Sequence, residues 1–289
     1  FFAARRTDLQ RRRNSGAAMP EWPEVEFCRR RLVSWILGDV IEDVWASAGP
    51  PLRGQTPEQL QTSLRGKRIS EIHRKGKQLA CKLSNGPILF VHLGMTGKWL
   101  KKERGEARHK HVRMSIVIAQ KTYRLDFLDP RRFGRIRSVS AGLWEQAPEW
   151  VGLGPDAMEL VQRPVDFCER VGVGQRTIKA VLLDQTVLSG VGNIYAAEAL
   201  FLAGVDPRRA ANDLSDRELC ELALHLRGTM MASLGRERGE QIRYIQDRGT
   251  PNPFVIYGRA GEACVNCGES IQRMSQHGRS TFWCSACQS

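Results

Sequence analysis

Four cysteines near the C-terminus constrain this chain more than any other feature of its sequence. They are spaced Cys264-x2-Cys267-x16-Cys284-x2-Cys287. Each CxxC pair can hold one edge of a tetrahedral ion, and the hairpin between the pairs can return the second to the first. Because protein sulfurs would fill every coordination position, the sequence predicts one structural Zn2+ ion without a catalytic role. A redox-active thiol pair is the alternative.

The other cysteines stand singly, at Cys28, Cys81, Cys168 and Cys220. One metal cluster beside isolated cysteines is typical of a reducing compartment rather than of a disulfide-bonded secreted protein. We expect these four side chains to be buried thiols without chemical function.

The charge balance indicates a polyanionic partner. The 289 residues carry a formal net charge of +13, and a polyanion would relieve the self-repulsion, with nucleic acid the first choice and an anionic membrane surface the second. Charged residues interrupt every apolar run before the roughly 18 residues that a membrane span requires. The length favours two domains.

The first residues form a basic segment of their own. Residues 1–18 contain five arginines and one acidic residue. They lack the apolar core of a secretory signal, although their composition is compatible with an organellar transit peptide. The simpler interpretation is a basic extension, residues 1–19, that is disordered or absent from the mature protein, since MPEWPEVE at 19–26 reads like the start of a protein.

Hydrophobic periodicity divides the remainder into two halves. Pro23 and the acidic residues after it form a helix-start pattern, and the helical repeat ends at Gly38. From about 66 to 139 the apolar residues alternate around an Asn85-Gly86 turn, which predicts a mainly antiparallel sheet.

The second half has the period of helices. Residues 144–157 indicate a linker, helical repeats follow within 178–188, 194–202 and 214–234, and 235–262 indicate a loop.

Several short motifs are weak when each is taken alone. GVGNIYA at 190–196 places Asn193 at a helix start, where backbone N–H groups favour phosphate, although an ordinary capped turn explains it equally. RKGKQLACKL (74–83), HLGMTG (92–97) and DPRRFG (129–134) place cationic or bulky residues at strand ends. Each of these could equally be core or solvated surface.

Together and in this order, the pieces resemble the formamidopyrimidine-DNA glycosylase family, whose relatives include endonuclease VIII. The resemblance runs from Met19 to Cys287 and rests on PEWPEVE, DPRRFG, GVGNIYA and the four-cysteine finger. It implies an α+β multidomain fold with double-stranded damaged DNA in a cleft between the halves. The implied parts are an N-terminal helix with an antiparallel β-sandwich (20–150), a helix-two-turns-helix domain (151–250) and a C-terminal zinc finger (251–289).

The resemblance also implies a nucleophile. In this family the initiator Met is removed and the exposed proline amine attacks the sugar, which assigns the role to Pro20 here. A proline nitrogen inside a peptide bond has its lone pair in amide resonance and cannot attack. A free terminal amine titrates near pH 7.7–8.0 in general, and its secondary-amine adduct is an iminium that acidifies the adjacent C2′ hydrogen.

The remaining catalytic roles come from the same resemblance. Glu21 is the implied acid/base group and Glu24 supports it. Lys77 is assigned to proton donation in β-elimination, and Arg279 to δ-elimination and phosphate binding. Because a guanidinium is a poor acid, we expect Arg279 to act through its charge.

Base flipping requires side chains that fill the vacated stack. The resemblance gives this role to Met95, Arg131 and Phe133, in place of the core interpretation. Phosphate contacts are implied for Asn193, Lys179, Arg176 and His109.

Two departures from the family pattern bear on specificity. Trp22 replaces the usual leucine, and the loop 246–257 is shorter and richer in proline than the segment that covers 8-oxoguanine in better-known members. We expect a bifunctional glycosylase and AP lyase acting on oxidised purines, with an endonuclease VIII-like preference for oxidised pyrimidines as the alternative. A non-catalytic damaged-DNA binder is the other alternative, if residues 1–19 are retained.

The same resemblance sets the expected surroundings of the protein. We expect a monomer in the cytoplasm, associated with the nucleoid if the source is bacterial. Organellar targeting by residues 1–18 is the alternative.

Overall fold

The structure, a computed structural model, describes residues 19–143, 146–245, 247 and 249–289. These residues form two compact units. The sheet unit comprises Met19–Asp156 and Ser233–Arg243, and the helical unit comprises Ala157–Ala232 and Tyr244–Ser289. Within the part of the chain that is described, the helices are all too short or too polar to cross a bilayer. The predicted basic extension, apart from Met19, lies outside the described residues.

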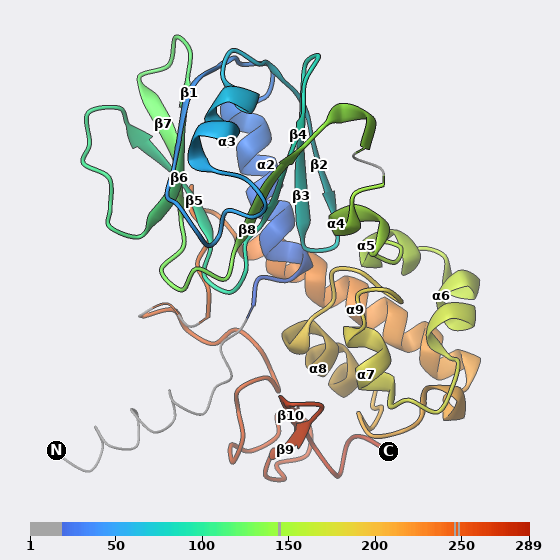
Figure 1. The fold of residues 1–289 in the computed structure, drawn as a ribbon. Coiled ribbons are helices and arrows are strands. Elements are labelled where there is room, and N and C mark those ends of the chain that lie inside the picture. Colours follow the sequence, from blue (N-terminus) through green and yellow to red (C-terminus); the bar gives the residue numbers. More distant parts are fainter. Residues whose placement is uncertain (1–18, 144–145, 246, 248) are drawn as a thin grey trace, which may run out of the picture. The chain divides into compact units, whose positions relative to one another are not determined.

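The sheet unit begins with helix α2 (Trp22–Ile36), which confirms the predicted helix. Pro23 lies in its first turn, where a missing N–H costs nothing. Val25 and Leu32 are on its buried face. After the helix, Gly38 adopts a left-handed φ of +85° and donates its N–H to the Ile69 carbonyl at 2.8 Å. Figure 1 shows α2 running alongside β2 and β3.

Two four-stranded sheets, all antiparallel, make up the body of this unit (Figure 1). Their strand orders are β1-β6-β7-β5 and β2-β3-β4-β8. Helix α3 (Pro57–Leu64) packs against β1 and β8, which belong to different sheets. The strands are β1 (Ile41–Ala46), β2 (Ile69–Lys75), β3 (Gln78–Leu83), β4 (Ile88–His92), β5 (Lys98–Glu103), β6 (Val112–Ile118), β7 (Tyr123–Leu128) and β8 (Arg135–Val139).

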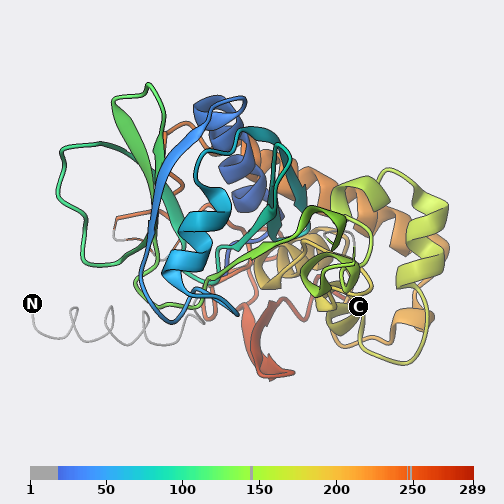
Figure 2. The same cartoon turned by 45° about the horizontal axis from the view of Figure 1, so that its top comes forward.

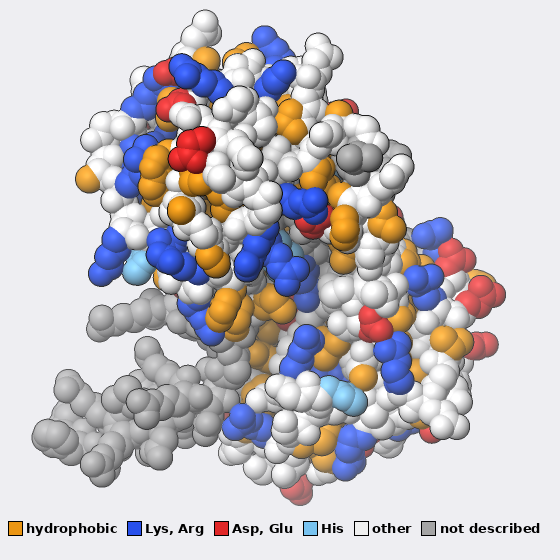
Figure 3. Space-filling model, viewed as in Figure 1, with side chains coloured by type: hydrophobic (Ala, Val, Ile, Leu, Met, Phe, Trp, Pro, Cys, Tyr) orange, Lys and Arg blue, Asp and Glu red, His pale blue; other side chains and the backbone are white. Residues whose placement is uncertain are grey.

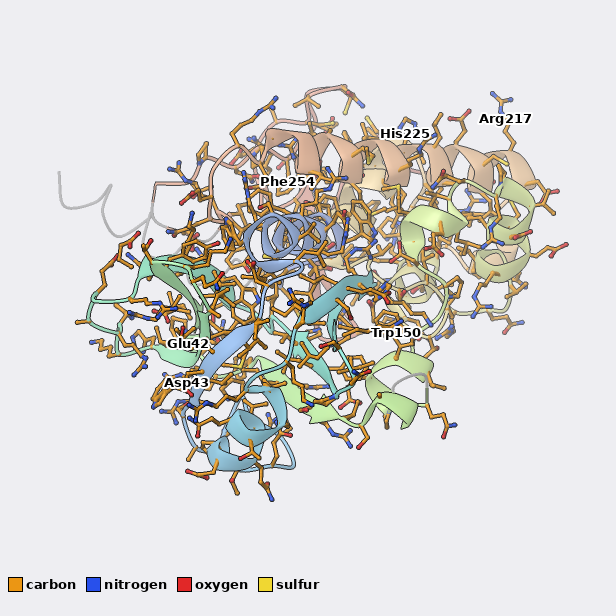
Figure 4. The ribbon with its side chains drawn as sticks, turned by 90° about the horizontal axis from the view of Figure 1, so that it is seen from above. Glu42, Asp43, Trp150, Arg217, His225 and Phe254 are labelled. Atoms are coloured by element: carbon orange, nitrogen blue, oxygen red, sulfur yellow. The ribbon has the colours of Figure 1, made fainter. Side chains whose placement is uncertain are left out.

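The described part of the predicted linker 144–157 is packed against the sheet unit. It contains helix α4 (Pro148–Val151). The ring centroid of Trp150, which is labelled in Figure 4, lies 6.1 Å from that of Phe90 on β4. Glu149 forms an ion pair with Arg137 at 2.9 Å. These residues thus precede the boundary between the two units along the chain, and an aromatic contact and an ion pair fix them against the sheet unit.

The helical unit contains helices and a two-stranded ribbon, which is red in Figure 2. Helix α8 is buried on nearly all sides, and its Glu198 carboxylate accepts the N–H groups of residues 255, 256 and 257, each at 2.9 Å. The elements are α5 (Ala157–Leu160), α6 (Pro164–Val171), α7 (Ile178–Leu183), α8 (Asn193–Leu202), α9 (Asp216–Arg236), β9 (Gln272–Gln276) and β10 (Arg279–Trp283), with α9 continuing into the sheet unit.

The scattered cysteines divide into two kinds. Cys28 and Cys81 are buried as predicted, but Cys220 on α9 is exposed and Cys168 on α6 is half-buried. The Sγ atoms of Cys168 and Cys220 lie 4.0 Å apart. The prediction of four buried, isolated thiols was therefore wrong for this pair, because Cys220 is exposed, Cys168 is only half-buried, and their Sγ atoms are neighbours.

Candidate functional site

The four C-terminal cysteines converge as their spacing predicts. Their Sγ atoms all lie within 4.8 Å of one another, with Cys264 and Cys287 at 3.9 Å and Cys267 and Cys284 at 3.5 Å. Tetrahedral zinc with Zn–S bonds of about 2.3 Å holds its sulfurs roughly 3.8 Å apart. The donor set and its dimensions thus fit one structural Zn2+ ion.

Between the two cysteine pairs, strands β9 and β10 form a tight hairpin. Its turn residues His277 and Gly278 have φ values of +51° and +73°, as a two-residue hairpin turn with two left-handed positions requires. Arg279 follows directly as the first residue of β10 and is exposed. The hairpin therefore presents the Arg279 guanidinium at its tip.

Two predicted phosphate-binding residues also hold this hairpin within the helical unit. Lys179 on α7 is 1% exposed, and its Nζ donates to Thr281 Oγ1 at 2.6 Å. Asn193, the first residue of α8, donates through Nδ2 to the Ser280 carbonyl at 2.8 Å. The structure thus joins GVGNIYA and Lys179 to the strand that carries Arg279.

The other predicted phosphate contacts lie at the surface. Arg176 pairs with Asp184 at 2.7 Å, and its side chain is 55% exposed. His109 is exposed in the loop between β5 and β6, with its ring 5.2 Å from that of His111. Figure 3 shows lysine and arginine side chains gathered along one rim of the sheet unit, with few acidic ones among them.

The predicted catalytic residues at the start of α2 are enclosed. Pro20 is buried and Glu21 is 1% exposed. The Glu21 N–H donates to Glu24 Oε2 at 2.8 Å, one half of a capping box between the two residues. Glu24 therefore holds the backbone of Glu21 at the helix start, which is a supporting position rather than a reacting one.

Lys77 lies in the two-residue turn that joins β2 to β3. Lys75 and Gln78 pair across the hairpin, and Gly76 takes the left-handed turn position with φ +55°. Lys77 is only 6% exposed. Burial, and then the charges of Lys77 and Arg135, lower the pKa of His92 to about 4. His92 is thus a neutral imidazole at physiological pH, close to Lys77, and no motif in the sequence singled it out.

The three residues predicted to fill the flipped-base void come from two loops that are tied together. Asp129, fully buried, accepts from Thr96 Oγ1 and from the Gly134 N–H, both at 2.8 Å. Met95, beside Thr96, is half-buried, whereas Phe133, beside Gly134, is 50% exposed.

Arg131, the third of the residues predicted to fill the void, lies beside the exposed ring of Phe133. The Arg131 guanidinium lies 4.8 Å from the centroid of the Phe133 ring. Phe133 and Arg131 are therefore surface residues on a rigid support, and the core interpretation does not apply to Phe133. The sequence did not identify Asp129 as that support.

Three models of known domain families match successive parts of the chain. The formamidopyrimidine-DNA glycosylase N-terminal domain matches residues 19–136, the formamidopyrimidine-DNA glycosylase H2TH domain matches 153–243, and a zinc finger found in FPG and IleRS matches 261–289.

Individual relatives match over nearly their full length. The chain is 34% identical to formamidopyrimidine-DNA glycosylase of Desulfitobacterium hafniense, covering 93% of this chain and 100% of the relative. It is 36% identical to the Thermus thermophilus protein of that name, covering 93% and 98%.

Solved structures with the same fold include complexes with DNA. MutM bound to DNA containing carbocyclic 8-oxo-G matches with a TM-score of 0.80 and 30% identity, covering 93% of this chain and 99% of that one. Lactococcus lactis Fpg (MutM) bound to DNA containing an oxidised pyrimidine matches with a TM-score of 0.81 at the same identity and coverage.

Proposed function

Since the chain belongs to the formamidopyrimidine-DNA glycosylase family, and is therefore a base-excision-repair DNA glycosylase and AP lyase, we propose that it excises oxidised purines with Pro20 as nucleophile. The proposed substrates are 8-oxoguanine and formamidopyrimidines in duplex DNA. The observation that carries this assignment is the bond between Glu21 and Glu24, which fixes a buried carboxylate beside Pro20.

The first chemical step requires a free Pro20 amine. Once the upstream residues are absent, a terminal amine with an ordinary pKa of about 7.7–8.0 is substantially neutral at physiological pH. Its nitrogen bonds to C1′ of the deoxyribose while the bond from C1′ to the damaged base breaks. Glu21 moves the protons that base departure and ring opening require.

The second step breaks the DNA strand. The Pro20 iminium withdraws electrons, so the C2′ hydrogen passes as a proton to water, a double bond forms between C2′ and C3′, and the C3′–O bond breaks to release the 3′ phosphate. Lys77 donates a proton to the oxygen of the departing phosphate. The Arg279 charge then stabilises the second phosphate as it departs in δ-elimination.

Access to the base depends on the loops tied by Asp129. Extruding a base from duplex DNA costs a few kcal/mol, and side chains that occupy the gap offset that cost. We assign Met95 and Phe133 to wedge the step and Arg131 to pair with the orphaned base. Arg176, Lys179, Asn193 and His109 are assigned to backbone phosphates. Lys179 and Asn193 also hold the hairpin that carries Arg279.

The lesion preference can be tested by comparing excision of purine and pyrimidine lesions. The DPRRFG sequence supports purine lesions, and a relative binds DNA containing 8-oxo-G. The Lactococcus relative bound to oxidised-pyrimidine DNA supports the alternative. Single-turnover excision of 8-oxoguanine opposite cytosine, formamidopyrimidine and thymine glycol tests the two. Strong thymine glycol release beside negligible purine release would reverse the assignment.

Bacterial relatives support a cytoplasmic, nucleoid-associated protein. Imaging of a C-terminal fluorescent fusion in living cells tests this location. We also propose that the domains follow the boundaries 20–150, 151–250 and 251–289, and that the protein is a monomer, which sedimentation equilibrium tests.

A further inference from the structure

Asp156 is a buried carboxylate that accepts hydrogen bonds from the start of α2 and from the hairpin between β2 and β3. It is 4% exposed. Its Oδ1 accepts from Trp22 Nε1 at 2.9 Å and from Arg74 Nη2 at 3.3 Å. Its Oδ2 accepts from the Gly76 N–H at 2.9 Å and from Arg74 Nη1. These four bonds match the number of lone-pair sites that an ionised carboxylate offers.

Two of the three donor residues, Trp22 and Gly76, directly adjoin residues assigned to catalysis. Trp22 follows Glu21 directly, and Gly76 precedes Lys77. We propose that Trp22 and Asp156 are positioning residues that set the Pro20–Glu21 segment relative to the turn that carries Lys77. This role rests on the proposed function, because it concerns how the acid/base groups of that reaction are brought into register.

The tryptophan makes this connection particular to the chain. Trp22 is 4% exposed, and the Arg74 guanidinium lies 4.7 Å from the centroid of its ring. A leucine at this position, as the family resemblance implies, has no N–H to donate to Asp156. Trp22 therefore adds a directional link between the helix start and Asp156 that a leucine cannot supply.

Further hydrogen bonds from Arg74 connect the residues around Asp156. Arg74 also donates to the Gly76 carbonyl at 3.2 Å and to Glu26 Oε2 at 3.0 Å. Charge-assisted hydrogen bonds in a buried setting are short and strong, and removing one partner leaves a buried charge uncompensated. These hydrogen bonds thus favour one arrangement of the side chains. That arrangement sets the position of the Pro20–Glu21 segment relative to the turn that carries Lys77. Displacing a catalytic group by about 1 Å can slow a reaction by roughly 100-fold.

The test compares two network variants with two matched controls in a chain that begins at Pro20. Trp22→Phe keeps the ring beneath Arg74 but removes the N–H, and Asp156→Asn removes the charge. Trp45→Phe and Asp126→Asn are the controls. Trp45 also has an arginine over its ring, at 4.6 Å, and Asp126 is a buried carboxylate paired with Arg124 at 2.9 Å.

The rate of β-elimination on a preformed abasic duplex is measured under single turnover, beside the Kd for a duplex with an uncleavable abasic analogue. We expect the rate to fall at least about 10-fold in Asp156→Asn and about 3-fold in Trp22→Phe. The Kd should stay within about 2-fold of the unsubstituted chain, and both controls should keep its rate.

Unchanged rates in both network variants, or an equal loss in the controls, would overturn the proposal. If Asp156→Asn fails to fold, Trp22→Phe alone decides.

Hydrogen exchange separates this inference from the proposed function. In both network variants, the amides of residues 21–27 and 74–80 should exchange faster together, whereas in the controls neither segment should change. Absence of lyase activity in the unsubstituted chain would refute the proposed function. Independent exchange of the two segments would refute the connection through Asp156, whatever the activity.

Discussion

Gly94 lies against the backbone of Phe133, so closely that a Cβ atom on Gly94 would come within 2.6 Å of the Phe133 carbonyl oxygen. Gly94 also has a left-handed φ of +67°. No side chain fits in this position, and the close approach brings the Met95 loop and the Phe133 loop together. The two proposed wedge residues thus depend on a glycine.

Substitution of Gly94 by alanine should therefore impair excision from duplex DNA. We expect at least a 10-fold lower single-turnover rate, on the order of 1.4 kcal/mol or more, because the added methyl group forces the loops apart. Gly105→Ala is the matched control, since nothing lies within 4 Å of a Cβ at Gly105. Equal excision by Gly94→Ala and Gly105→Ala would show that loop contact is unimportant.

Zinc removal should disorder the hairpin that presents Arg279. The free energy of binding structural zinc, about 10–16 kcal/mol in small finger domains, is coupled to folding of the site. Cys267→Ser should lose the single zinc ion seen by elemental analysis and weaken binding to duplex DNA at least 10-fold. Cys220→Ser, outside the cluster, should retain both. Full DNA affinity in a zinc-free protein would contradict a role for the hairpin.

Acid stability should depend on Glu26. Burial raises its pKa, but hydrogen bonds from Arg29, Arg30 and Arg74 outweigh burial and lower the pKa to about 2. A depressed folded-state pKa contributes stability above the unfolded value, near 4.5, and that contribution is lost as pH falls towards 2.

Glu26→Gln should therefore lower the free energy of unfolding at pH 7 by about 3 kcal/mol. Denaturant titrations between pH 7 and 2 should show a shallower acid limb in the variant. Parallel curves for the two proteins would mean that the three arginines do not stabilise the Glu26 carboxylate.

Thiol reactivity should separate the two kinds of scattered cysteine. Burial raises the pKa of Cys81 to about 12, and burial followed by the charges of Glu24 and Glu237 does the same for Cys28. Burial and a hydrogen bond with Cys220 raise the pKa of Cys168 to about 11. Because the thiolate is the reactive form, alkylation of Cys168 should be slow at pH 8 and rise about tenfold per pH unit.

Mass spectrometry of the natively alkylated protein checks this ordering. Cys168 and Cys220 should be labelled, while Cys28 and Cys81 should react only after unfolding. Early labelling of Cys28 would show that α2 opens readily.

The sequence predicted elements whose signals are local. Pro23 and Gly38 bracket α2 in both the prediction and the structure, and the cysteine spacing predicted the metal cluster. Alternation was a poorer guide. In β3 the first four residues, Gln78 to Cys81, are all buried, because both faces of the strand are covered. Strand β1, which precedes the alternating region, was missed because a register shift between Ile41 and Asp43 breaks its alternation.

The supporting residues of the site could not be predicted, because their partners are distant in the chain. Asp156 lies 134 residues from Trp22, and Asp129 bonds Thr96 across 33 residues. An aspartate after a strand or within a glycine-rich segment carries no sequence signal of such a partner. Lys179 was predicted as a phosphate ligand from its position, and only the structure reveals its bond to Thr281.

The identity of the nucleophile is tested most directly by borohydride trapping on a duplex containing 8-oxoguanine, followed by peptide mapping of the adduct. The chain that begins at Pro20 should give a covalent protein–DNA adduct attached through the Pro20 nitrogen, and the chain that retains residues 1–19 should give none. Equal trapping by both chains, or an adduct at any other residue, would contradict the mechanism.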